Sequence, residues 1–179
     1  MIIKNSIGKK IILMLSLVLG LMMLSGCSSK DNITIKTYQD QKVNLAGYKN
    51  YQWLVGGNIL VDDGQKWRAR AYDINRFVER QIAKELYNKK IIKTQIRPDF
   101  LISYVVGINM DAIKEKVDKN GEKYFANVPE AGLGIVFLDP ITRQVIWASN
   151  AEATLMPELS DEESKERIAY AIEQMFTQF

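Results

Sequence analysis

The chain begins with an apolar run that determines where its folded part can lie. Residues 11–24 hold one hydroxyl side chain and no charge, and three lysines but no acid precede them. A helix needs about 20 apolar residues to span a bilayer, so this run is too short. A basic start followed by a short apolar run is typical of a signal peptide. We therefore expect the globular fold downstream of it.

The run ends in Leu24-Ser25-Gly26-Cys27, which resembles the lipobox of bacterial lipoproteins. The resemblance implies cleavage between Gly26 and Cys27, diacylglycerol on the Cys27 thiol and an acylated amine, with palmitate as a typical acyl chain. At about 0.8 kcal/mol per buried CH₂, such chains make an anchor effectively permanent. The alternatives are an ordinary secreted protein and an uncleaved signal anchor that happens to carry a cysteine.

The residue after Cys27 bears on the location of the protein. In lipoproteins kept in the inner membrane of Gram-negative bacteria this position is typically aspartate, whereas here it is Ser28. By the same resemblance we expect a lipid-anchored protein of the outer membrane that faces the periplasm.

The composition excludes several kinds of chemistry. There is no histidine, so nucleophile sets and metal sites that need histidine are absent, and one cysteine cannot form an intramolecular disulfide. Without residues 1–26 the chain holds 21 basic and 21 acidic side chains, so its basic pI belongs largely to the signal peptide. We expect no cofactor, no metal and no nucleic-acid partner.

The rest of the chain has the size of one domain. We assign residues 1–26 to the signal peptide, 27–31 to the lipidated cysteine and a short tether, and 32–179 to a single globular domain. Four extended tether residues reach about 14 Å at most. The domain should therefore lie close to the lipid surface.

Two helices are indicated. The first begins near Asp73, a good N-cap, and fades near Asn88. The second begins with the capping box Ser160–Glu163 and runs to the last residue. Their apolar faces are Ile74, Phe77, Val78, Ile82 and Leu86 in the first and Ile168, Ile172, Met175, Phe176 and Phe179 in the second.

Strand patterns lie before and between these helices. One strand pattern begins at Ile33, and the others are Tyr51–Val55, Phe100–Asn109, Ile135–Leu138 and Gln144–Ala148. Asn120-Gly121 predicts a hairpin turn between two further strands. The apolar Phe100–Asn109 is typical of a strand covered on both faces or nearly so. The predicted fold is α+β, a single domain with a mixed, mostly antiparallel sheet of about five or six strands packed by two helices.

The same segments resemble a known family, the domain of unknown function 4136. The resemblance rests on Gly47–Leu54, Arg97–Tyr104, Gly134–Asp139 and Val145–Trp147, in order, and spans roughly residues 32–179. Members are typically bacterial lipoproteins of this size, with no established catalytic residues. The chain departs from the family in having Lys89-Lys90 where glycine is common, and in lacking a final proline.

Several residues are candidates for a site. Trp53 and Trp147 are expected to pack in the core, whereas Trp67 could be partly exposed and available to stack on a ligand or to make cation–π contacts. Asp99 and Asp139 could do acid–base work, but each adjoins a proline, where aspartate commonly caps a turn. Asp62-Asp63 could contribute to a calcium site, although a turn is favoured because no matching ligand spacing follows.

A basic segment is the most suggestive feature. Residues 66–97 hold ten basic and three acidic side chains, whereas 148–179 hold two basic and seven acidic ones. The basic segment could be a solvated face neutralised by the acidic second helix, or a surface for anionic lipid headgroups, lipopolysaccharide phosphates or an acidic partner. The residues predicted for that surface are Lys66, Arg68, Arg70, Arg76, Arg80 and Lys84.

These observations favour a non-enzymatic lipoprotein, held to the membrane through Cys27, that binds an envelope protein, an anionic lipid or a polymer. The competing interpretations are a carrier for a small ligand or lipid, and a histidine-free hydrolase that acts on envelope substrates. Either would need a concave pocket that holds a carboxylate or lysine of strongly perturbed pKa.

Overall fold

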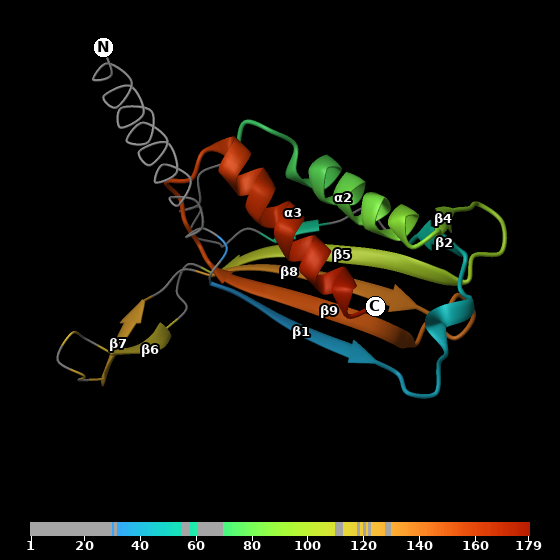
Figure 1. Ribbon diagram of the computed structural model, residues 1–179, viewed down its shortest axis with the longest axis horizontal. Coiled ribbons are helices and arrows are strands. Elements are labelled where there is room, and N and C mark those ends of the chain that lie inside the picture. The colour runs from blue at the N-terminus through green and yellow to red at the C-terminus, as the bar shows by residue number, and fades with distance from the viewer. Residues whose placement is uncertain are drawn as a thin grey trace, which may run out of the picture. The chain divides into compact units, whose positions relative to one another are not determined.

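The computed structural model describes residues 30, 32–54, 58–60, 70–109, 113–117, 119, 121, 123–127 and 130–179 (Figure 1). The predicted signal peptide, Cys27, Asp62-Asp63, Lys66, Trp67 and Arg68 lie outside these residues. The elements in order are β1 (Ile33–Gln39), a 3₁₀ helix η2 (Leu45–Gly47), β2 (Asn50–Trp53), β3 (Asn58–Leu60), α2 (Ile74–Asn88), β4 (Ile92–Lys93), β5 (Phe100–Asn109), β6 (Ile113–Val117), β7 (Lys123–Asn127), β8 (Glu130–Leu138), β9 (Val145–Thr154) and α3 (Asp161–Thr177). Chain contacts group residues 32–179 into one unit.

The main sheet is mixed, as the sequence predicts. Its strand order is β1-β9-β8-β5-β2-β4, and the short β3 also pairs with β5. The pairs β1–β9, β9–β8 and β8–β5 are antiparallel. Strands β2 and β3 each pair with β5 in parallel, and β4 pairs with β2 in parallel. Parallel neighbours need a crossover connection, and α2 supplies it between β2 and β5. The predicted Asn-Gly hairpin is present as the separate pair β6–β7.

Helix α2 begins and ends as its sequence indicates. The Asp73 side chain accepts a hydrogen bond from the backbone N–H of Arg76, which caps the first turn. At the other end Ile91 N–H donates to the Leu86 carbonyl at 2.9 Å and Lys90 N–H to the Tyr87 carbonyl at 2.8 Å. These two bonds form a Schellman motif, which turns the chain directly into β4.

Helix α3 carries the predicted capping box in full. The Ser160 hydroxyl accepts from Glu163 N–H at 3.2 Å, and the Glu163 carboxylate accepts from Ser160 N–H at 2.8 Å. Three acids, Asp161, Glu162 and Glu163, lie in its first turn, where they interact favourably with the helix dipole. The helix is thus stabilised locally before it packs.

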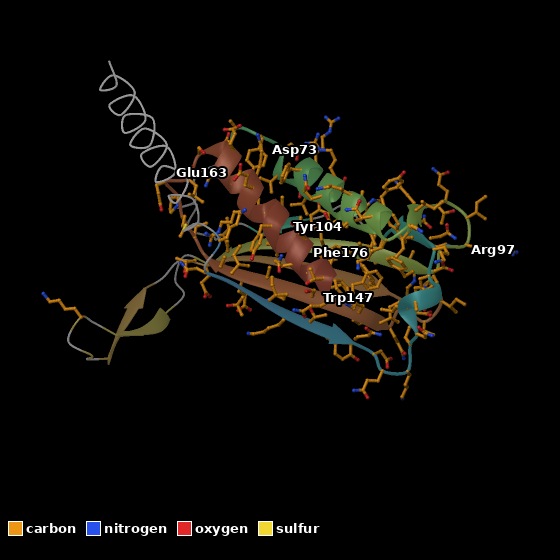
Figure 2. The ribbon with its side chains drawn as sticks, in the orientation of Figure 1. Asp73, Arg97, Tyr104, Trp147, Glu163 and Phe176 are labelled. Atoms are coloured by element: carbon orange, nitrogen blue, oxygen red, sulfur yellow. The ribbon has the colours of Figure 1, made fainter. Side chains whose placement is uncertain are left out.

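The core lies between one face of the sheet and both helices, and Figure 2 labels Trp147 and Phe176 within it. Its centre is an aromatic cluster in which the Phe137 ring lies 4.3 Å from that of Phe100 and 4.5 Å from that of Trp147, centroid to centroid. Phe179 packs edge-on against Phe137 and Trp147, and the Lys89 ammonium donates to its carbonyl at 2.7 Å. The end of α2 and the end of the chain are thus held together.

Two strand predictions need correction. Strands β8 and β9 are longer than the predicted segments. Strand β8 already begins at Glu130 and β9 continues to Thr154, and small and polar residues in these extensions replace the apolar run. The expectation that Phe100–Asn109 is covered on both faces or nearly so holds at Leu101, which is 6% exposed, but not along the whole strand. Both helices lie on one face, so Val105 on the other is 37% exposed.

Candidate binding surface

Three of the predicted basic residues form one exposed row on α2. Arg76, Arg80 and Lys84 follow each other at intervals of four residues, which places them on the same side of the helix. The opposite side of α2 is buried in the core through Ile74, Phe77, Val78, Ile82 and Leu86. Within the part of the chain that the structure describes, the one ion pair of the row joins Lys84 to its neighbour Glu85 at 3.9 Å, and all three side chains of the row are exposed.

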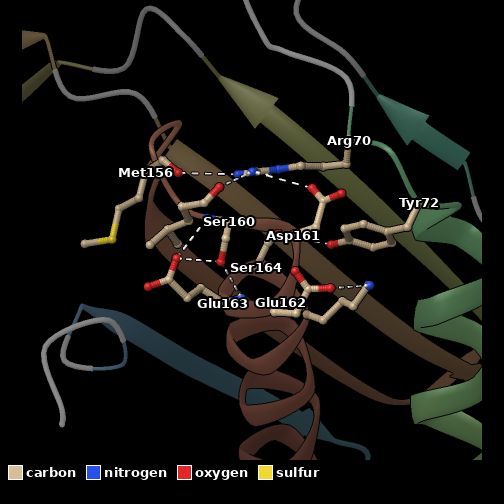
Figure 3. A network of polar contacts seen from close by, with 10 residues as sticks. Arg70, Tyr72, Met156, Ser160, Asp161, Glu162, Glu163 and Ser164 are labelled. Atoms are coloured by element: carbon tan, nitrogen blue, oxygen red, sulfur yellow. Dashed lines mark hydrogen bonds and ion pairs between the residues drawn. The ribbon is translucent and has the colours of Figure 1, made fainter.

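Arg70 does not belong to that surface, and its prediction as a surface residue is corrected. Its guanidinium donates to the carbonyls of Leu159 and Met156 and lies 3.9 Å from the Asp161 carboxylate, and its side chain is only 11% exposed (Figure 3). The residue therefore fixes the start of α3 against the segment that leads into α2. This role depends on two carbonyls distant in sequence, and no local pattern could have indicated it.

A second connection lies beside Arg70. The Tyr72 hydroxyl is 3.0 Å from the Ser164 hydroxyl, and the Lys165 ammonium lies 4.8 Å from the centroid of the Tyr72 ring. Arg70 and Tyr72 together join the entry of α2 to the first turns of α3 (Figure 3). The row on α2 is therefore held by tertiary contacts as well as by its own cap.

The sequence analysis missed the apolar side chains that extend this surface. Immediately after the basic row, Tyr87 is 73% exposed, Ile92 55% and Ile96 78%. Lys90, Lys93 and Arg97 are exposed between them, and no acidic residue occurs between Glu85 and Asp99. An isoleucine in a strand is normally expected to be buried. Ile92 is exposed because β4 lies at the edge of the sheet, and the sequence alone does not show that position.

Two of these cations occupy unfavourable backbone conformations. Lys90 has φ 63° and Arg97 has φ 51°, both in the left-handed region. This region costs an L-residue about 1–2 kcal/mol relative to the right-handed one, and glycine occupies it most readily. The chain thus keeps a basic side chain at both turns that flank β4, and Figure 2 shows Arg97 on the loop after that strand.

The two candidate acid–base residues act as turn residues. The Asp99 carboxylate accepts from the backbone N–H groups of Lys49 and Asn50, at 2.7 and 2.8 Å. The Asp139 carboxylate accepts from those of Thr142 and Ile141, at 2.7 and 2.8 Å, and these bonds lower its pKa. The pKa of Tyr48 is raised by burial and by both carboxylates, Asp139 more than Asp99.

Trp53 and Trp147 pack in the core as predicted, whereas the prediction for Trp67 lies outside the described residues. Trp147 is fully buried, with ring contacts to Phe137, Phe176 and Phe179. Trp53 is half-buried and packs edge-on against Tyr51 and Tyr104. Both therefore serve the core.

An apolar cavity lies between the sheet and the two helices. Its volume is about 120 Å³, and its lining includes the apolar Ile74, Val78, Leu133 and Ile168 together with Arg70 and Arg167. Arg167 donates to the Thr154 carbonyl at 3.2 Å, and burial lowers the pKa of its guanidinium.

The described residues include no group of His, Cys, Asp and Glu that could hold a metal. Nor does any described helix have the length and apolarity to cross a membrane.

The fold and the surface together define a small α+β domain that presents a basic face. The chain belongs to the family described as Domain of unknown function (DUF4136), whose sequence model matches residues 35–179, as the resemblance implies. A comparison with curated proteins gives no match.

Solved structures share the fold at low identity. A DUF4136 family protein from Bacteroides thetaiotaomicron VPI-5482 is 13% identical with a TM-score of 0.51, and the match covers 83% of this chain and 96% of that one. A PDZ domain protein from Parabacteroides distasonis ATCC 8503 is 15% identical with a TM-score of 0.51. That match covers 82% of this chain and only 36% of the longer protein. These likenesses establish the fold.

Proposed function

We propose that this chain is a lipid-anchored protein of the bacterial cell envelope, attached through Cys27 to the outer membrane on its periplasmic side. The proposal is supported by the signal-peptide pattern, by the lipobox with the only cysteine of the chain, and by membership of the family. Ser28 supports export to the outer membrane. The domain would act there as a binding module and not as an enzyme.

The exposed basic row of α2 carries the binding proposal. Arg76, Arg80 and Lys84 point away from the core, on a helix whose two ends are fixed by caps and whose entry is tied to α3. Like charges at this spacing cost a few tenths of a kcal/mol each. The row therefore destabilises the isolated helix slightly, and an anionic envelope component bound along it would remove that repulsion.

In-cell cross-linking followed by mass spectrometry tests this proposal. We expect the wild-type lipoprotein to give a specific anionic envelope partner, and Arg76→Glu with Arg80→Glu to lose it. Lys36→Glu with Lys42→Glu is the matched control, because both lysines are exposed and lie away from α2 and β4. Cys27→Ala should lose the lipid mass and the membrane location. An unchanged partner set in the α2 variant would refute the binding proposal.

The cavity supports a second candidate, a carrier for a small apolar ligand. Its volume of about 120 Å³ is of the order of the engineered cavities that bind benzene. Ala171 lies on its wall and is almost fully buried, so Ala171→Leu would reduce the space without adding a polar group. If the domain is a carrier, benzene should raise the melting temperature of the wild type and not that of the variant.

A further inference from the structure

The segment from Tyr87 to Arg97 presents apolar and basic side chains in alternation. Tyr87, Ile92 and Ile96 are the large apolar residues exposed there. Lys90, Lys93 and Arg97 are the exposed cations. The segment follows directly on the basic row of α2, and Tyr87 lies three residues after Lys84 on the same side of the helix.

The exposure of these side chains is built into the fold. Ile91, between them, is 4% exposed and is fixed by its Schellman bond to Leu86. Ile92 N–H donates to the Lys49 carbonyl at 2.8 Å, which holds β4 on the sheet edge. Thus Ile92 faces solvent from a strand that is bonded in place.

The loop after β4 is equally fixed. Thr94 N–H donates to the Tyr51 carbonyl at 2.8 Å. The Thr94 hydroxyl donates to the Ile96 carbonyl at 3.0 Å and accepts from Ile96 N–H at 3.2 Å. These bonds keep Ile96 at the tip of the loop with 78% of its surface exposed.

The charges around the segment are almost all positive. The first acid after it is Asp99, whose carboxylate accepts from the backbone N–H groups of Lys49 and Asn50, and the segment itself contains basic residues and no acid. Lys89 is directed to the carbonyl of Phe179, which leaves Lys90, Lys93 and Arg97 as the outward cations. An occupant must therefore offer anionic groups and an apolar phase side by side.

The headgroup region of a membrane offers both within a few ångströms, since phosphates lie directly above the acyl chains. An acidic protein surface satisfies the cations but leaves two exposed isoleucines in contact with charge. We propose that this segment docks on a bilayer of anionic lipid, with Tyr87, Ile92 and Ile96 inserted at the level of the headgroups. The inference rests on the proposed function, because it names the anionic component that the basic surface binds.

The proposal requires the basic side chains to lie at the phosphate level. Lys and Arg hold their charge at that level while their alkyl stems lie in the apolar layer, and tyrosine is similarly amphipathic. Lys90 and Arg97, in left-handed turns on either side of β4, would then flank the inserted isoleucines with cations.

Depth-dependent fluorescence quenching tests the proposal on the lipidated protein reconstituted into vesicles. A cysteine introduced by Ile96→Cys carries an environment-sensitive dye, and in the lipidated protein the Cys27 thiol carries diacylglycerol and so does not react with the dye. Wild-type protein treated with the same dye checks that no other site is labelled. The vesicles are phosphatidylcholine alone, or phosphatidylcholine with phosphatidylglycerol, and each is prepared with and without brominated acyl chains.

In the anionic vesicles we expect a blue shift of the dye at position 96 and a loss of its fluorescence to the brominated chains. Tyr38→Cys is the matched control, because Tyr38 is 55% exposed on β1, at the opposite edge of the sheet, and should show neither. Arg76→Glu with Arg80→Glu should reduce the quenching at position 96. Equal signals at 96 and 38 would overturn the inference.

The outcomes separate this inference from the proposed function. If position 96 stays unquenched while the α2 charge reversal still abolishes the cross-linked partner, the basic surface binds an acidic protein and the bilayer inference fails alone. If quenching occurs and the cross-linked partner is unaffected, the inference holds and the partner proposal fails. If position 96 stays unquenched and the α2 charge reversal leaves the cross-linked partners unchanged, both the inference and the partner proposal fail.

Discussion

The carboxylate of Asp99, the residue immediately before β5, accepts the backbone N–H of Asn50, the first residue of β2, at 2.8 Å, and that of Lys49 at 2.7 Å. In return Asp99 N–H donates to the Asn50 carbonyl at 3.0 Å. These bonds precede the parallel pairing of Tyr51 with Phe100 and so help to set its register. A residue that resembled an acid–base candidate thus aligns two strands.

Asp99→Ala should therefore destabilise the domain. It leaves two backbone N–H groups without their acceptor, so the free energy of unfolding should fall by about 1–3 kcal/mol. Asp99→Asn should cost less, because its amide oxygen still accepts. Urea denaturation measures both, with Glu173→Ala, at an exposed position in the body of α3, as the control. The alignment role is refuted if Asp99→Ala unfolds at the same midpoint as the control.

The turn between β8 and β9 should make stability depend on pH. Backbone N–H groups of Thr142 and Ile141 lower the pKa of Asp139 below its ordinary 3.8. A carboxyl whose pKa is lower folded than unfolded stabilises the fold above the unfolded pKa, and this stabilisation is lost as the pH falls through the folded pKa.

The pH prediction concerns the difference between wild type and Asp139→Asn. The free energy of unfolding of the wild type should exceed that of the variant at pH 7, and the difference should shrink progressively below pH 3.8. Urea denaturation at pH 7, 4 and 3 gives the comparison. A difference that is constant over this range would show that the charge of Asp139 makes no contribution.

The helices could be predicted because their signals are local. Asp73, the Ser160–Glu163 box and the apolar spacing of each helix specify start, end and buried face within one stretch of chain. The order of strands in the sheet could not be predicted, because pairing such as that of β1 with β9 joins residues more than 100 positions apart. The domain limits followed from the end of the signal-peptide pattern and from the alternating strand pattern that begins at Ile33.

The candidate surface was only half predictable for the same reason. Periodicity identifies Arg76, Arg80 and Lys84 as the outward row of an amphipathic helix. It cannot show that Arg70 turns inward to the carbonyl of Leu159, or that Ile96 is displayed by a hydroxyl-bonded turn. Both facts depend on contacts made after folding.

The core should respond to very small changes. Ile172 on α3 is completely buried, so Ile172→Val should lower the free energy of unfolding by about 0.5–1.5 kcal/mol through a lost methylene and the space left behind. Ile141 is 88% exposed, and Ile141→Val is the matched control with no expected change. Thermal unfolding followed by circular dichroism compares the two. Equal melting temperatures would contradict the packing of α3 described above.

The capping box of α3 should stabilise the fold, and the size of this stabilisation should depend on whether Glu163 is ionised. Ser160→Ala removes the acceptor for Glu163 N–H and should lower the free energy of unfolding by about 1 kcal/mol at pH 7, whereas Ser160→Thr should retain most of it. The hydroxyl and the backbone N–H of Ser160 lower the pKa of Glu163 below its ordinary 4.5. Loss of the hydroxyl should therefore raise that pKa towards the ordinary value.

Two measurements separate the cap from a general loss of packing. Carboxyl titration by NMR should show the pKa of Glu163 higher in Ser160→Ala than in the wild type and unchanged in Ser160→Thr. The stability difference between wild type and Ser160→Ala should diminish as the pH falls below 4.5, because protonated Glu163 no longer gains from the bond. A stability loss that is the same at pH 7 and pH 3, with no change in the Glu163 titration, would mean that the box does not act as the geometry indicates.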